Sequence, residues 1–142
     1  MSGLKDLFGE EVIGKGGSKV SVDSLAQNDL IGIYFSAHWC GPCRYFTPKL
    51  AEFYNKVKAA GKKFEVIFVS SDQDEASFNN YYGQMPWLTV GFGNDKGDSL
   101  SDRYEVTGIP TLVFVDKHGK EKDRDGRDRV DEDPNGFPWD LA

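Results

Sequence analysis

Residues 30 to 60 constrain the fold more than any other part of the chain. Leu30 to Phe35 is a short apolar run rich in β-branched and aromatic residues, which is typical of a strand buried on both faces. Residues 44 to 60 have the 3.6-residue period of an amphipathic helix that ends at Gly61. The apolar positions of that period are Phe46, Leu50, Phe53, Tyr54 and Val57. The pattern predicts a strand-to-helix junction at Trp39-Cys40-Gly41-Pro42-Cys43.

The rest of the chain alternates between strand and helix patterns. Phe64 to Val69 predicts a second buried strand, and Asp72 with Glu75 predicts a capping pair that opens a helix through Tyr82. Residues 99 to 104 predict a short helix, and residues 111 to 115 predict a third strand that turns into an antiparallel partner. This order predicts the α/β class, with a mixed central sheet and helices on both faces.

Two segments imitate ligand-binding loops. Val12-Ile13 and Val20 to Val22 flank the glycine-rich residues 14 to 17 and predict an N-terminal β-hairpin. Residues 9 to 16 resemble a phosphate-binding loop, but Gly16 stands where Ser or Thr would ligate magnesium, so we interpret this segment as a plain turn. Residues 121 to 132 resemble a calcium loop, but their interspersed arginines favour an ion-paired surface.

Length and charge narrow the classes of protein. The 142 residues suit one domain, which we expect to span residues 1–142. The formal net charge of -6 disfavours nucleic acid and anionic membranes as partners. Neither an apolar signal region nor a membrane-length apolar stretch is present in the sequence, so we expect a cytoplasmic protein, with the nucleus as an alternative.

The chain has only two cysteines, and they lie three residues apart at the predicted start of the helix. Helix N-termini stabilise a thiolate and lower a cysteine pKa from about 8.5 to about 7 in redox proteins of this kind. Cys40 is therefore the predicted nucleophile, and Cys43, one helical turn on, the predicted resolving thiol. A zinc site would need His38 and His118 as further ligands, and a purely structural disulfide would close only a very short loop.

The segment from Phe35 to Arg44 resembles the active site of the thioredoxin superfamily, in particular its nucleoredoxin and tryparedoxin branch. The resemblance continues at residues 46–48, 64–72, 85–88, 108–111 and 137–139 and covers nearly the whole chain after the first hairpin. It implies a thioredoxin-like fold and a cis peptide bond between Ile109 and Pro110, beside the cysteines. It also implies that Trp39, Gly41, Pro42, Ile109 and Pro110 contact the substrate.

The chain departs from these relatives at three positions. It carries Gly41-Pro42 between its cysteines, where this branch usually has Pro-Pro. Ser71 stands where tryparedoxins tend to have a tryptophan. Tyr34 occupies the place of the buried aspartate of thioredoxins, and because a tyrosine is no base at neutral pH, we expect a water or the leaving thiolate to take the proton of Cys43.

These residues together predict a monomeric protein-disulfide reductase without cofactor or metal. Its expected partners are proteins that contain a disulfide, with a peroxiredoxin as one candidate. Its electrons would come from an upstream dithiol or reductase, for which thioredoxin reductase, glutathione and trypanothione are the alternatives. A second hypothesis is a redox-sensitive adaptor that regulates a signalling partner and whose catalysis is incidental.

Overall fold

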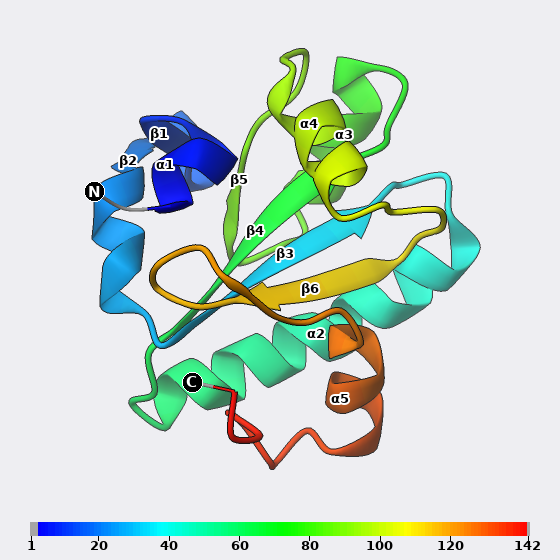
Figure 1. Cartoon of the computed structure of the whole chain (residues 1–142). Coiled ribbons are helices and arrows are strands. Elements are labelled where there is room, and N and C mark those ends of the chain that lie inside the picture. The colour runs from blue at the N-terminus through cyan, green and yellow to red at the C-terminus, as the bar shows by residue number, and fades with distance from the viewer. Residues whose placement is uncertain (1–2, 142) are drawn as a thin grey trace.

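A computed structural model describes residues 3–141 (Figure 1). The strands are β1 (Glu11–Ile13), β2 (Lys19–Ser21), β3 (Leu30–Ser36), β4 (Phe64–Ser70), β5 (Leu88–Thr89), β6 (Thr111–Val115) and β7 (Glu121–Asp123). The α-helices are α1 (Gly3–Phe8), α2 (Gly41–Ala59), α3 (Glu75–Tyr82), α4 (Lys96–Arg103) and α5 (Gly126–Glu132), and a 3₁₀-helix, η2 (Val22–Gln27), precedes β3. None of the described helices is long and apolar enough to span a membrane.

The seven strands form one mixed sheet in the order β2-β1-β5-β4-β3-β6-β7. The first strand predicted from the sequence, β3, lies inside this sheet, with β4 parallel on one side and β6 antiparallel on the other. All seven residues of β3 are buried. The prediction of a strand that is covered on both faces is confirmed, and so is the α/β class with a mixed sheet.

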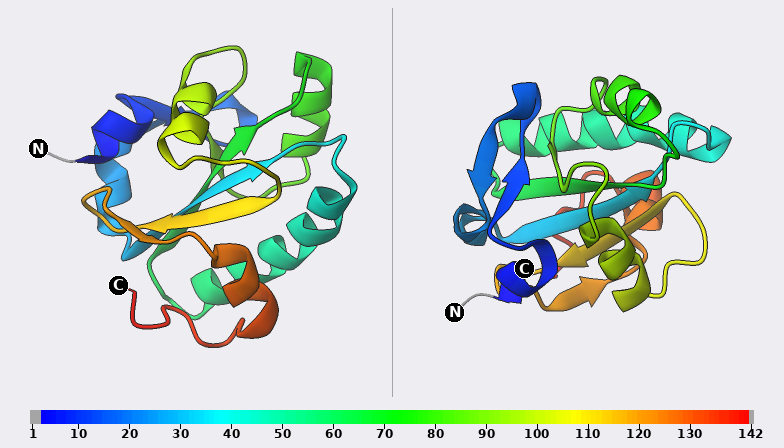
Figure 2. Two further views of the ribbon diagram at one scale, coloured as in Figure 1. Left: turned by 45° about the vertical axis from the view of Figure 1, so that its right-hand side comes forward. Right: turned by 90° about the horizontal axis from the view of Figure 1, so that it is seen from above.

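The two faces of the sheet have separate cores, because successive side chains of a strand point to opposite faces. Alternate residues of β3, β4 and β6 pack with α2, α3, α5 and the segment around Phe137. The intervening residues pack with α1, η2 and α4. Figure 2 shows this division, with α2 and α3 on one side of the strands and α1 and α4 on the other.

The N-terminal hairpin is present and is continuous with the main sheet. β1 and β2 pair antiparallel, with Val12 opposite Val20. Ile13 of β1 also pairs with Thr89 of β5, which attaches the hairpin to β4. The sequence does not predict β5, because a strand of two residues is too short to have a period.

Two local predictions were wrong, and one helix was not predicted. The cap of α3 is Asp74, whose side chain accepts from the Ser77 N–H at 2.7 Å, and Asp72 serves another purpose described below. Helix α4 begins at Lys96, three residues before the predicted start. Residues 121 to 132 carry the predicted ion pairs, Arg124 with Glu121 and Arg129 with Asp123, and β7 is the predicted antiparallel partner of β6, but helix α5 was not predicted. Among the described helices, α5 is a short one that buries only Gly126 and Val130, so its apolar period is weak.

Candidate functional site

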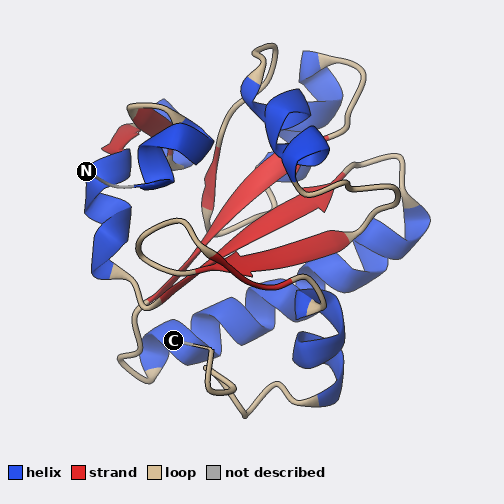
Figure 3. Ribbon diagram, viewed as in Figure 1, coloured by secondary structure: helices blue, strands red, loops and turns tan. Residues whose placement is uncertain are grey.

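Cys40 and Cys43 lie at the junction of β3 and α2, where the chain leaves the sheet through a short loop (Figure 3). Cys40 is the N-cap of α2, and its Sγ accepts the Cys43 N–H at 3.2 Å. The Cα atoms of the pair are 5.2 Å apart, and the two sulfurs form a disulfide. The helix start predicted from the sequence is confirmed, since one unpaired N–H of the first turn points at the Cys40 sulfur.

The two sulfurs differ in exposure. Cys40 retains 6% of its surface, whereas Cys43 is completely buried. This small difference favours Cys40 over Cys43 as the cysteine that an incoming disulfide reaches. This difference matches the predicted order of attack, with Cys40 first and Cys43 second.

The peptide bond between Ile109 and Pro110 is cis, as the resemblance implied. It lies directly before β6, which is the neighbour of β3 in the sheet. The carbonyl oxygen of Ile109 is 3.7 Å from Cys40 Sγ, and the Ile109 side chain packs against Ala37 and the two cysteines. Two segments separated by about seventy residues in sequence thus meet at Cys40, and the backbone of Ile109 forms one wall of the site.

Trp39, Gly41 and Pro42 form the exposed rim of the site. The indole N–H of Trp39 donates to the backbone oxygen of Ser71 at 3.1 Å, which fixes the ring beside Cys40. A Cβ added to Gly41 would meet nothing within 4 Å, so the surface beside the Cys40 sulfur is open at this position.

Asp72 supports the loop that carries the cysteines. Its carboxylate accepts from the His38 N–H and from the Ser70 hydroxyl, at 2.8 and 2.7 Å. The Ser71 N–H in turn donates to the Ser36 carbonyl at 2.9 Å. Sequence reasoning missed this contribution because it assigned Asp72 to the cap of α3. The signal that could have found it is the position of Asp72 after β4, which is the neighbour of the strand that leads to Cys40.

Four hydroxyl groups form a buried chain beneath α2. Tyr34 hydrogen-bonds Thr47 at 2.7 Å, Thr47 bonds Tyr81 at 2.5 Å, and Tyr81 bonds Ser36 at 2.7 Å. Burial raises the pKa of Tyr34 well above its ordinary value. Tyr34 is therefore a neutral hydroxyl at physiological pH and cannot act there as a resting base.

We expect the substitution Tyr34→Phe to change stability more than chemistry. The ring would stay in the core and one hydrogen bond would be lost, so the free energy of unfolding should fall by about 1 kcal/mol. Thr47 would keep its partner Tyr81. The rate of thiol exchange at neutral pH should stay within about twofold of the wild type. Denaturant unfolding and the reduction of a small disulfide measure the two quantities, and a rate loss of about tenfold or more would assign the hydroxyl to proton transfer.

The structure gives the zinc interpretation no support. Within residues 3–141, no three His, Cys, Asp or Glu side chains are placed to hold a metal ion. His118 lies in the turn between β6 and β7, at the opposite end of β6 from Pro110. One of the ligands that a zinc site would need is therefore at the wrong end of the sheet.

Comparison with known proteins places this geometry in a family. Residues 28–121 match a family model described as thioredoxin-like. A nucleoredoxin from Bos taurus is 44% identical over 139 residues, which are 96% of this chain and 32% of the relative. A tryparedoxin from Trypanosoma brucei brucei is 44% identical over 144 residues, which are 98% of this chain and 99% of the relative.

Solved structures agree with the sequence comparison. A tryparedoxin II complexed with glutathionylspermidine is 39% identical, and it superimposes with a TM-score of 0.88 over 97% of this chain and 99% of its own. The chain spans about a third of the length of the animal nucleoredoxins that it matches, and nearly all of a tryparedoxin. The chain therefore belongs to the thioredoxin-like family, in the branch that contains the nucleoredoxins and tryparedoxins.

Proposed function

We propose that this protein is a dithiol-disulfide oxidoreductase that reduces disulfides in partner proteins. The observation that carries the proposal is the pair of sulfurs at the start of α2, where Cys40 retains 6% of its surface and Cys43 is fully buried. A structural disulfide does not need an accessible sulfur at a helix N-terminus. An adaptor would need only the surface around the cysteines and no reactive sulfur. This geometry therefore favours an enzyme over an adaptor.

The reaction runs in two thiol exchanges that balance in atoms and electrons. The Cys40 thiolate attacks one sulfur of the substrate disulfide, forms a mixed disulfide and releases the other substrate sulfur as a thiolate. The Cys43 thiol loses its proton to water or to that thiolate and attacks Cys40 Sγ. The substrate leaves as a dithiol with two more electrons, and the protein is left with the Cys40–Cys43 disulfide that the structure contains.

The substrate would bind along the rim already described. The backbone of Ile109 lies beside Cys40, so an extended substrate segment can pair with it as an added strand. Pro110, which follows it in cis, sets the direction of this edge before β6 begins. Trp39, Gly41 and Pro42 would contact the same segment from the α2 side.

The proposal also includes candidates for the electron donor and for the partner proteins. Glutathionylspermidine, seen bound to a tryparedoxin II, makes a low-molecular-weight thiol one candidate donor. Thioredoxin reductase and glutathione are the others, and a peroxiredoxin is a candidate acceptor. We propose that the protein acts in the cytoplasm or nucleus, as a monomer, with residues 1–142 forming one thioredoxin-like domain.

Turnover of a protein disulfide tests the proposal. The wild-type chain is mixed with insulin and supplied in parallel with thioredoxin reductase and NADPH, with glutathione, and with trypanothione. We expect catalysed insulin reduction with at least one donor, and the fastest arm identifies the physiological class of reductant. Failure of all three donors, together with failure of dithiothreitol-driven turnover, would contradict the proposed activity.

A further inference from the structure

Two large apolar side chains are strongly exposed in the described part of the chain, and both are near the cysteines. Trp39 is 60% exposed and Tyr45 is 70% exposed, while the other large apolar side chains are buried or partly buried. Trp and Tyr side chains carry much of the binding energy of protein interfaces. Trp39 is already part of the proposed substrate rim, but Tyr45 is unexplained.

Tyr45 lies on the same face of α2 as the open position next to Cys40. Gly41 and Tyr45 are four residues apart, so they are neighbours along one stripe of the helix. Gly41 has no side chain, and a Cβ there would meet no other atom within 4 Å. At Gly41, which lies between Cys40 and Tyr45 along the chain, no side chain obstructs the surface.

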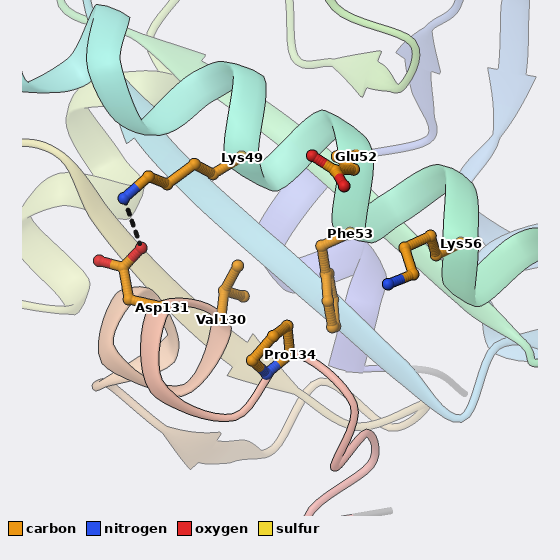
Figure 4. A pocket seen from close by; sticks show the side chains of 7 residues that line it. All are labelled: Lys49, Glu52, Phe53, Lys56, Val130, Asp131 and Pro134. Carbon is orange, nitrogen blue, oxygen red and sulfur yellow. Dashed lines mark ion pairs between the residues drawn. The ribbon is translucent and has the colours of Figure 1, made fainter.

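One neighbouring side chain contacts the Tyr45 ring and restricts its orientation. Lys49, one turn further along the same stripe, places its ammonium 4.4 Å from the ring centroid. Lys49 also pairs with Asp131 of α5 at 3.5 Å, which Figure 4 shows beside a cavity of about 230 Å³ between the two helices. The Lys49 ammonium thus interacts with both the Asp131 carboxylate and the Tyr45 ring. The rest of the Tyr45 ring stays exposed and presents an apolar surface to a partner.

We propose that Tyr45 is a docking residue for protein substrates, and that it receives a large apolar side chain close to the substrate disulfide. The inference rests on the proposed function and extends it to substrate choice. Tyr45 is five residues beyond Cys40, which is about 7 Å along a helix axis and matches about two residues of an extended segment. A folded protein or a peptide can therefore span from Cys40 to Tyr45, whereas a small disulfide ends at the sulfur.

A ring held by its neighbours is well suited to this purpose. Binding a mobile side chain costs conformational entropy, and fixing it beforehand reduces that cost. Trp39 is fixed by Ser71 on one side of Cys40 and Tyr45 by Lys49 on the other. Together they are two exposed aromatic contacts, one before and one after the cysteine pair, that an extended apolar partner can meet.

The test compares two substrates on matched variants. Insulin serves as the protein disulfide and hydroxyethyl disulfide as the small one, with Tyr45→Ser, Tyr45→Phe and the exposed Lys56→Ala of the same helix as variants. For Tyr45→Ser, the ratio of kcat/KM on insulin to kcat/KM on hydroxyethyl disulfide should fall about tenfold, mainly through KM. Tyr45→Phe, which keeps the ring, and Lys56→Ala should leave this ratio within about twofold of the wild type.

The possible failures are distinguishable. If the wild type reduces neither substrate, the proposed function itself is wrong. If the wild type reduces both and Tyr45→Ser leaves the ratio unchanged, or lowers both activities equally, Tyr45 is not a docking residue. A fall of the ratio in Lys56→Ala as large as in Tyr45→Ser would assign the effect to the helix surface in general and would also overturn the inference.

Discussion

Replacing Cys40 by serine should abolish disulfide reduction, with a loss of about a thousandfold or more in kcat/KM. A serine hydroxyl is almost entirely protonated at neutral pH and does not form a stable covalent bond with a substrate sulfur. Cys43 cannot substitute for it, because the Cys43 side chain is completely buried. Steady-state reduction of insulin by the wild type and by Cys40→Ser measures the loss.

The same variant separates the enzyme from the adaptor. Serine is close to cysteine in size and can accept the Cys43 N–H as the sulfur does, so α2 should keep its N-cap. An unfolding measurement on Cys40→Ser, compared with the reduced wild type, controls for stability. The contrary outcome is that Cys40→Ser loses turnover and still binds a target protein with full biological effect. That result would show that the adaptor hypothesis is correct and that catalysis is incidental.

The centre of the fold could be predicted from the sequence because its signals are strong and local. β3 and β4 are short, mostly apolar runs, and α2 has a regular apolar period within its 19 residues. The predicted junction of β3 and α2 also showed where the two cysteines lie in the fold. The sheet order beyond β3 and β4 was less accessible, because β5 has two residues and acquires its place only by pairing with β1 and β4.

The site was predicted in the parts that a motif or a resemblance covers. The roles of Cys40 and Cys43 follow from their spacing and from the helix start. The cis peptide at Ile109 came only from the resemblance, since sequence alone shows that a proline is present but not which isomer the surrounding structure selects. The support that Asp72 gives to the active-site loop was missed, because a carboxylate before a helix predicts a cap equally well.

The sequence does not single out Tyr45 as a contact residue, for a different reason. Tyr45 lies outside the apolar period of α2, and its aromatic side chain there has no special meaning in the sequence. Its exposure, the contact with Lys49 and the pairing of Lys49 with Asp131 depend on where α5 packs, and α5 itself was not predicted. Contacts between elements of low periodicity can be found only in the structure.

Replacing Cys43 by serine should stop the reaction after the first exchange and accumulate a mixed disulfide between Cys40 and the substrate. Cys40 keeps its exposure and its place at the start of α2, so the first attack remains possible. The second attack requires the sulfur one helical turn away, and a serine hydroxyl cannot provide it. Non-reducing electrophoresis and mass spectrometry should detect an adduct that dithiothreitol removes.

The trapped species also tests the assignment of the two cysteines. In Cys43→Ser the adduct should be linked through Cys40, whereas Cys40→Ser should yield no adduct above background because Cys43 is buried. An adduct on Cys43 in the Cys40→Ser variant would reverse the order of attack. Since the adduct forms with the substrate still aligned on the rim, its yield with insulin should fall in the double variant Cys43→Ser/Tyr45→Ser, which links the chemistry at Cys40 to the proposed contact at Tyr45.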